Sequence, residues 1–413
     1  MEDGSESGAC RAGTEGVPGG LAPFDAEETL RLLHDPRVAA AGLAGMRAVR
    51  DASLAPVVEL ASDGGRTREI AFGLSLQGLG PRLATLPPDP RLPHELRAHF
   101  DSESVRGAAR GERIVGLLAR VAGLLESERI RAVPLKGAAL LLGGTVPAGL
   151  RPMADVDLLL ESEDELRRAA AVLSGELGYG PLWNTRRHLV LAERDERVVL
   201  PACEHPANPL RIELHRSFRL EVLGRSLDAT EALRRGTRRM GDWEVPGPDA
   251  LLLHLLFHAA EDFAAKGLRG VQAVDFLLLS RRAGPLVLPV LPRAARSPVV
   301  LAARAVEGLF PGTFDPKGLA RLAAAVPARV LRRAATIPVL RHARAERGWT
   351  MTSLGLVDGT VPAVRFVFRT AFPPLDEVKA NVAPGSTGLA LVAAWFGVLS
   401  RRLGSAARRL RGR

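Results

Sequence analysis

The segment RPMADVDLLL, residues 151–160, places Asp155 and Asp157 inside a run that is otherwise apolar. Side chains of a β-strand alternate between its two faces, so both aspartates point to one face and the intervening apolar residues to the other. A carboxylate is costly to bury without compensation, and two charges about 5 Å apart repel each other by about 3 kcal/mol. The segment therefore predicts a strand whose polar face needs a cation beside it.

The residues around this strand predict a compact α/β module. IRAVPLKG, residues 130–137, is typical of a short strand that ends in a turn and opens into a helix. Ser162 followed by Glu165 is a capping box, and it predicts the start of a second helix behind the aspartate strand. Three later runs also have strand character, namely 188–193, 197–202 and 210–218.

Apolar residues recur at helical spacing on both sides of this module. We therefore expect an α+β protein with a small mixed sheet and helices, flanked by N- and C-terminal helical regions, with helices resuming after about Asp228. The predicted divisions are a flexible leader (1–22), an N-terminal helical region (23–128), an α/β core (129–222), a C-terminal helical domain (223–385), and an amphipathic helix with a basic tail (386–413).

Glu213, in the strand RIELH, offers a third carboxylate. If this strand lies beside the Asp155–Asp157 strand, the three carboxylates converge. Hard oxygen ligands suit Mg²⁺, and such a cluster can hold two metal ions about 3.5–4 Å apart. The spacing alone also fits a salt-bridged aspartate pair on an edge strand, with Glu213 an unrelated surface residue.

Charge and composition narrow the classes of function. The net charge of +10 owes much to the last 13 residues, which carry six arginines, and with 4% aromatic residues nucleic-acid binding is a minor hypothesis. Two cysteines among 413 residues and no apolar leader predict a cytoplasmic protein. The apolar run 388–399, followed by the arginines, is too short to span a bilayer but suits peripheral membrane contact.

The motifs PLKGAALL, RPMADVDLLL, GYG and RIELH, in this order, resemble the uncharacterised nucleotidyltransferases, a family within the polymerase-β-like superfamily. The later LLLHLLFHAAED and VDFLLL segments are also similar, so the resemblance is dense over about 130–280. It implies a polymerase-β-like nucleotidyltransferase core that uses Mg²⁺ to transfer a nucleotidyl group from an NTP. Lys136 and Gly137 stand where better-known members of the superfamily have Gly-Ser or Gly-Gly.

The resemblance implies roles for individual residues. Asp155, Asp157 and Glu213 would bind metal and form the catalytic set. The residues expected to bind nucleotide, from the resemblance or from their charge and position, are Lys136, Gly137, Arg151 and His215. The co-substrate expected is an NTP, with ATP as the first choice. Arg151 fits a structural salt bridge to an aspartate equally well, and His215 fits either a substrate contact or a role in orienting Glu213.

Three further candidates lie in the helices after the core. His254, His258 and Asp262 share one helical face, which suits a zinc site, the substrate side of a nucleotide cleft, or ordinary core and surface positions. The metalloprotease-type Glu after the first His is absent, so zinc is the weakest of the three. Asp275 is either a general base for an acceptor hydroxyl or a buried partner of Arg269, and we favour the partner.

The sequence thus predicts an Mg²⁺-dependent nucleotidyltransferase that transfers an NMP group to an unidentified acceptor, either a small molecule or a protein. Two hypotheses of another class stay open. The first is that the module binds nucleotide or a partner without catalysis. The second is that the chain is a membrane-surface scaffold that uses its basic C-terminus. The sequence does not name the acceptor, the preferred base or the oligomeric state.

Overall fold

The structure is a computed structural model that describes residues 21–371, except 22, 23, 25, 34, 64, 65, 186, 194–204, 206 and 341–355. Most of the predicted leader, the predicted strand 197–202 and the segment 386–413 lie outside the described residues. Within the described part, each helix is too short or too polar to cross a membrane.

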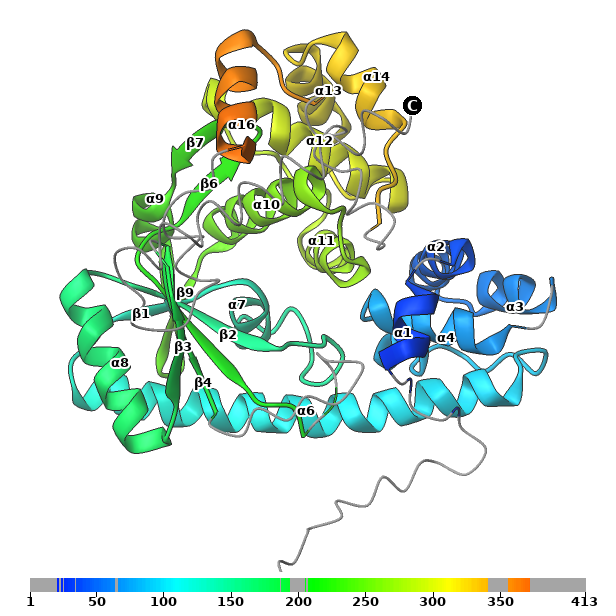
Figure 1. Ribbon diagram of the computed structural model, residues 1–413, viewed down its shortest axis with the longest axis horizontal. Helices are drawn as coiled ribbons and strands as arrows, with labels where there is room; N and C mark the ends of the chain where they lie inside the picture. The colour runs from blue at the N-terminus through cyan, green and yellow to red at the C-terminus, as the bar shows by residue number, and fades with distance from the viewer. Residues whose placement is uncertain are drawn as a thin grey trace, which may run out of the picture.

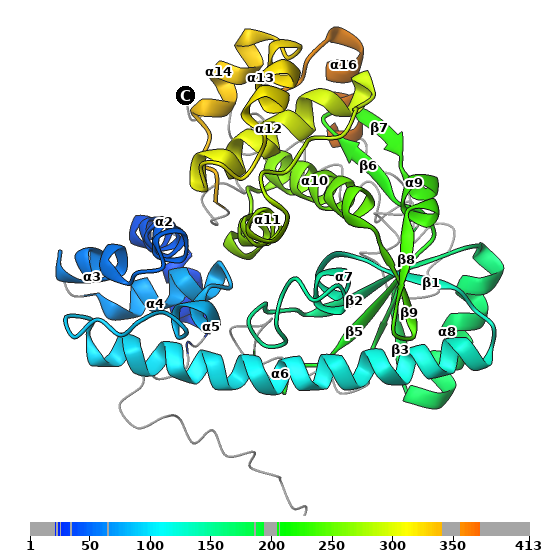
Figure 2. The same cartoon turned by 180° about the vertical axis from the view of Figure 1, so that it is seen from behind.

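The chain begins with helices that rest on one long helix. That long helix, α6, runs along the base of the molecule, with the other N-terminal helices over one of its ends and the sheet over the other (Figures 1 and 2). The bounds are α1 (Ala26–Leu32), α2 (Pro36–Asp51), α3 (Ala55–Ser62), α4 (Thr67–Leu76), α5 (Gly80–Leu83) and α6 (His94–Ser127).

Among the described residues, the core sheet has five strands in the order β1-β2-β5-β4-β3. β2 pairs in parallel with β5, and the other neighbouring pairs are antiparallel, so the predicted mixed sheet is confirmed. The strands are β1 (Ala132–Pro134), β2 (Asp155–Leu160), β3 (Gly180–Asn184), β4 (His188–Ala192) and β5 (Arg211–His215), with helices α7 (Lys136–Leu142) and α8 (Glu163–Leu177) between them.

Val156, Leu158 and Leu160 share one face of β2, opposite the aspartates, as the period-two pattern predicts, and the two faces belong to different apolar cores. Val156, Leu158 and Leu160 pack with α8 and the second half of α6, whereas Leu159 packs with the core formed by the N- and C-terminal helices. The capping box of α8 is also confirmed, because the Ser162 hydroxyl accepts a hydrogen bond from the Glu165 N–H at 3.1 Å. The aspartates therefore face α7 and the helices beyond it.

Two short hairpins follow the core. The first ends at Asp228, and the second interrupts the helices that were expected after about Asp228. The hairpins are β6 (Arg219–Val222) with β7 (Arg225–Asp228), and β8 (Thr237–Met240) with β9 (Trp243–Pro246), separated by α9 (Thr230–Arg235). Each of these strands has four residues, so the apolar alternation of β6 and β9 is too brief to identify a strand, and β7 and β8 show none.

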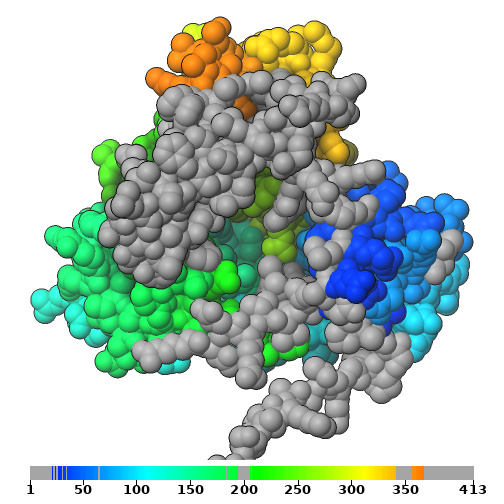
Figure 3. Space-filling model, viewed as in Figure 1, coloured from blue at the N-terminus to red at the C-terminus, as the bar shows by residue number. Residues whose placement is uncertain are grey.

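The remaining helices pack above the sheet and the N-terminal helices (Figure 1). They are α10 (Pro248–Ala265), α11 (Gly270–Ala283), α12 (Arg293–Leu309), α13 (Pro316–Ala324), α14 (Ala328–Ala335) and α16 (Thr360–Ala371). The helices predicted at 249–263 and 271–279 are therefore confirmed. In the space-filling view the surface is hollowed between the green core and the blue N-terminal helices, with yellow-green atoms at the floor (Figure 3).

Candidate functional site

The structure places Asp157 and Glu213 directly opposite each other on the adjacent parallel strands β2 and β5. Partners in such a ladder point to the same face, so both carboxylates project toward α7. His215, two residues after Glu213, projects the same way, and its Nε2 lies 2.8 Å from Asp157 Oδ1 and 3.6 Å from Glu213 Oε2. The predicted convergence of Asp157 with Glu213 is thus present, and His215 joins it.

Lys136 supplies a cation to this cluster from the first residue of α7. Its Nζ lies 2.5 Å from Asp157 Oδ1 and 3.9 Å from Glu213 Oε2. Its backbone has φ of +47°, a left-handed conformation that is unfavourable for a residue with a Cβ. Strain of this kind collects at functional sites, and here it turns the lysine side chain toward β2.

The electrostatics of the two aspartates differ. Burial and the neighbouring Asp157 carboxylate raise the pKa of Asp155 to about 6. Burial would also raise the pKa of Asp157, but the Lys136 ammonium and His215 hold it well below its usual range. Burial opposes the charge of His215 too, yet its hydrogen bonds to Asp157 and Glu213 raise its pKa. Asp157 is therefore the carboxylate of the site that Lys136 and His215 keep ionised.

The donor set fits a divalent cation. Asp157, Glu213 and His215 each offer one ligand atom, and these atoms all lie within 4.8 Å of one another. Asp155 lies two residues earlier on the same strand face, outside that set, although its carboxylate interacts with Asp157. Three carboxylates outnumber the cations of Lys136 and, when it is protonated, His215, and a divalent ion would neutralise the remaining negative charge.

The helix α10 positions the start of α7. His254 is fully buried, and its Nε2 accepts a hydrogen bond from the Lys136 backbone N–H at 3.0 Å. Burial holds the pKa of His254 well below its usual range, so the ring is neutral, as an acceptor must be. Its Nδ1 has no partner in the described residues. Sequence reasoning singled out this histidine without seeing that it binds the backbone of α7.

His258 lies one turn further along α10 and away from the carboxylates. Its Nε2 lies 2.9 Å from the Gln272 amide nitrogen and 3.9 Å from Asp262 Oδ2. Burial lowers the pKa of His258 to about 4. Within the described residues, His254 is the histidine of this helical face that hydrogen-bonds to the site, and His254, His258 and Asp262 form no metal-binding group there.

Arg151 pairs with Asp275, and this corrects the expected pairing of Asp275 with Arg269. Arg151 Nη2 lies 2.9 Å from Asp275 Oδ2, and its Nε donates to both carboxylate oxygens. Arg269 lies close enough for its charge to act on Asp275 as well. Because a Cβ on Gly137 would lie 2.3 Å from Arg151 Nη1, glycine at this position gives the guanidinium its place against α7.

Arg110 supports the backbone at the start of the two carboxylate strands, and sequence reasoning missed it. It is 2% exposed and extends from α6 to the start of β2 and to the turn before β5. Its guanidinium donates to the carbonyl oxygens of Met153, Ala154, Asn208 and Pro209. The signal was present, since Arg110 falls on the apolar stripe of its helix. His188 was missed as well, and its ring lies 5.3 Å from that of His215.

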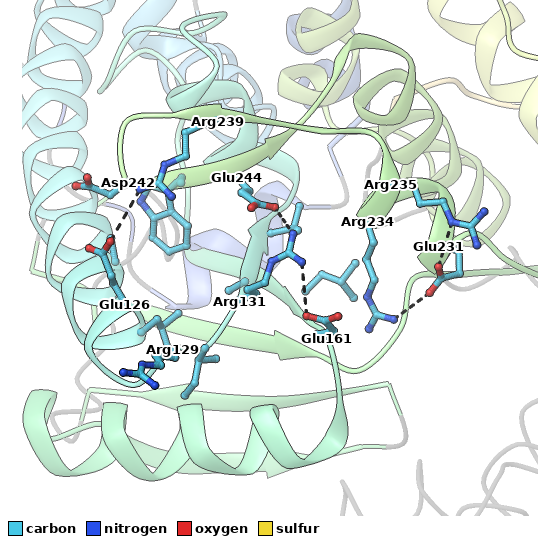
Figure 4. A pocket seen from close by; sticks show the side chains of 17 residues that line it. Glu126, Arg129, Arg131, Glu161, Glu231, Arg234, Arg235, Arg239, Asp242 and Glu244 are labelled. Carbon is cyan, nitrogen blue, oxygen red and sulfur yellow. Dashed lines mark hydrogen bonds and ion pairs between the residues drawn. The ribbon is translucent and has the colours of Figure 1, made fainter.

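A cavity of about 600 Å³ lies at the β1 edge of the core sheet, beside β9 and away from the carboxylate cluster. Its wall carries five arginines and five acidic residues, many of which pair with each other, as Arg131 does with Glu244 at 2.6 Å (Figure 4). The opposing charges balance, and the floor is apolar. Nothing in this lining resembles the donor set at Asp157.

Comparison with known proteins places the carboxylate cluster in a known family. Residues 76–303, more than half of the chain, match the family described as "Uncharacterised nucleotidyltransferase". No curated protein and no solved structure matches the chain. The matched region begins at the end of α4 and extends into α12, so it includes every residue of the carboxylate cluster. The chain therefore belongs to the family of uncharacterised nucleotidyltransferases.

Proposed function

We propose that the chain is an Mg²⁺-dependent nucleotidyltransferase that transfers an NMP group from an NTP, with ATP as the first choice. An oxygen of the acceptor attacks the α-phosphorus, the bond from that phosphorus to the bridging oxygen breaks, and pyrophosphate leaves. The acceptor proton passes to solvent or to a carboxylate. The observation that carries the proposal is the juxtaposition of Asp157 and Glu213 on parallel strands.

The roles proposed for single residues follow from their positions. Asp157 and Glu213 would hold Mg²⁺, with His215 as a further ligand whose atom lies within 4.8 Å of theirs, and Asp155, two residues earlier on the same face of β2, would join them. When bound, the metal neutralises charge on the phosphates of the NTP. Lys136 is placed to give a point charge to those phosphates when it leaves Asp157. Gly137 and Arg151 support the same end of α7, and His254 fixes its first N–H group.

Pyrophosphate release tests the proposal. The full chain is incubated with Mg²⁺, each NTP and a pool of acceptors that includes sugar phosphates, aminoglycosides and peptides. We expect release that depends on Mg²⁺ and falls on the order of 10³-fold in Asp157→Asn, because a preorganised charge is lost. Asp164→Asn, on an 82% exposed side chain of α8, is the matched control. Wild-type release by Asp157→Asn would exclude the metal assignment.

The same experiment separates catalysis from binding. If Mg²⁺ and a non-hydrolysable ATP analogue bind by calorimetry while no acceptor gives pyrophosphate, the chain is a nucleotide-binding module. If neither binding nor release occurs, the proposed function is wrong. The membrane-scaffold hypothesis rests on residues 388–413, which lie outside the described residues.

A further inference from the structure

A group of arginines surrounds Asp275 on the side of α11 that faces the N-terminal helices. Asp275 is 2% exposed and already holds Arg151 through paired hydrogen bonds. Arg82, from α5, lies close enough for its charge to act on Asp275, and Arg151 and Arg281 lie close enough to act on Arg82. The charges of Arg151, Arg82 and Arg269 act on this one carboxylate. Arg281, which donates to the Arg50 carbonyl at 3.0 Å, adds a further positive charge beside Arg82, so positive charge is in excess.

Arg82 is the member without a partner. Its Nε and Nη2 atoms are enclosed and make no hydrogen bond with the described residues. Burial and the neighbouring arginines lower the pKa of Arg82, although Asp275 opposes the shift. Enclosing guanidinium N–H groups without acceptors is costly, and an anion is the acceptor that such groups pair with best.

The position of Arg82 is fixed by a joint between two distant parts of the chain. Gln77, three residues before α5, is 1% exposed and caps the N-terminus of α11. Its side-chain oxygen accepts from the Gly270 N–H at 2.7 Å, and its carbonyl accepts from the Val271 N–H at 2.9 Å. This joint holds α5 beside the turn of α11 that carries Asp275, so the arginine is preorganised.

The arginine group adjoins the carboxylate cluster through Arg151. One end of its guanidinium holds Asp275, while Nη1 lies against Gly137, next to Lys136. The charge of Arg151 also acts on Asp155. A molecule bound at Arg82 would therefore lie beside the metal-binding face, on the side of the N-terminal helices rather than of the sheet.

We propose that Arg82, with Arg151 and Arg281, binds an anionic group, a phosphate or a carboxylate, of the acceptor that receives the nucleotidyl group. The inference rests on the proposed function, and it narrows the acceptor to an anionic molecule. The planar guanidinium fork suits two-point binding of either anion. The triphosphate would occupy the end of α7, and the acceptor anion would occupy the opposite side of the Arg151–Asp275 pair.

Calorimetry on the full chain tests the inference, with inorganic phosphate and succinate as probes for the two anion types. Each is titrated with and without saturating Mg²⁺ and a non-hydrolysable ATP analogue. We expect at least one probe to bind in the presence of the analogue, with its Kd raised tenfold or more in Arg82→Gln and less in Arg82→Lys. Arg167→Gln, on a 68% exposed side chain of α8, should leave the Kd unchanged.

Three outcomes would overturn the inference: neither probe binds the wild-type chain at millimolar concentration, Arg82→Gln binds as tightly as wild type, or the ATP analogue displaces the probe. If Arg82→Gln has a lowered thermal midpoint, Arg281→Gln replaces it, because that side chain is exposed and its loss should still weaken binding. Absence of analogue binding, with probe binding that depends on Arg82, would refute the proposed function but leave the anion site in place.

Discussion

Lys136 shows how a single residue links the backbone to the charge balance of the site. Its left-handed φ of +47° turns the chain from β1 into α7, its N–H donates to buried His254, and its ammonium lies 2.5 Å from Asp157. The ammonium thus lies among the carboxylates that would hold the metal. The charge of the lysine and the charge of a divalent ion therefore compete for Asp157.

Lys136→Met tests this competition. Removing the ammonium leaves the carboxylates without their fixed cation, so we expect Mn²⁺ to bind roughly tenfold more tightly, about 1.4 kcal/mol. Nucleotidyl transfer should nevertheless fall, since the charge that would contact the phosphates is gone. Electron paramagnetic resonance of free Mn²⁺ measures the affinity, with exposed Lys317→Met as the control. Unchanged or weaker Mn²⁺ binding would show that Lys136 does not compete.

A buried polar group outside the carboxylate cluster consists of His99, Ser75 and Glu103. Burial lowers the pKa of His99 from 6.5 to about 4, so between these values the unfolded chain binds a proton that the folded chain does not. The contribution of His99 to the free energy of unfolding therefore falls as the pH drops from 6.5 to 4, by up to about 3 kcal/mol.

The prediction is that His99→Gln loses less stability than wild type over this pH range. Urea unfolding at pH 7, 5.5 and 4.5 measures it, and the exposed His94→Gln should follow the wild-type curve. Glu103, whose pKa is raised by burial, acts in the opposite direction and is present in both chains. Parallel curves for wild type and His99→Gln would contradict the argument.

At the residue scale the sequence was most informative where the chemistry is local. Period-two alternation predicts that Asp157 and Glu213 point to one face if their strands are neighbours. The prediction that the strands are neighbours came from the family resemblance. The contact of Arg151 with Asp275 depends on how α11 packs against the loop before β2. Such a long-range contact leaves no periodic trace, so the sequence favoured Arg269 instead.

At the scale of elements, glycines on one face of α6 let this helix pack closely against the loop before β2. A Cβ at Gly111 would lie 2.4 Å from the Gly149 backbone nitrogen, and one at Gly107 would lie 2.5 Å from the Gly149 oxygen. Gly149 has φ of +85°, which suits glycine alone. This close approach lets Arg110 reach the carbonyl groups at the start of β2.

Gly111→Ala tests this packing, and Gly116→Ala on the same helix is its control. The first substitution forces two backbones apart, so we expect a loss of about 1–3 kcal/mol in the free energy of unfolding. The second meets open space, and the higher helix propensity of alanine should stabilise the chain by about 0.5–1 kcal/mol. Equal effects of the two substitutions in urea unfolding would rule out the close approach.

The strands of the core sheet that the sequence predicted differ from the hairpin strands that it missed in their length and in the turns that join them. β2, β4 and β5 carry alternating or continuous apolar residues because their faces are buried. The strands of the hairpin β6–β7 have four residues each, and its two-residue turn, Leu223–Gly224, has positive φ at both positions, as in a type I′ turn. Asn or Asp is usual at the first of these positions, so leucine concealed the turn.

At the scale of the molecule, α6 connects the N-terminal helices to the sheet, and the Gln77 joint connects the same helices to α11. The apolar core is shared accordingly, because one buried cluster extends from α2 through α10 to α13. The division of the chain into 23–128, 129–222 and 223–385 stays a prediction. Sequence periodicity identifies the helices, but it does not encode which of them share a core.

Gln77→Ala should weaken the contact between the N-terminal helices and α11. The buried Gly270 N–H loses its acceptor, at a cost of about 1–3 kcal/mol. We expect faster hydrogen exchange at Gly270 and a lower thermal midpoint. Transfer activity should also fall, although Gln77 lies outside the carboxylate cluster. Arg47→Ala, on an exposed side chain of α2, is the control. Unchanged exchange at Gly270 would mean that the joint does not hold α11.

The central claim is that Asp157 and Glu213 support transfer of a nucleotidyl group, and position-specific labelling tests it most directly. The full chain is incubated with Mg²⁺, acceptors and ATP labelled either at the α- or at the γ-phosphate. The account predicts that the α-label appears on an acceptor, that the γ-label leaves as pyrophosphate, and that Asp157→Asn abolishes both while Asp164→Asn does not. Transfer of the γ-label to an acceptor, or full activity of Asp157→Asn, would contradict it.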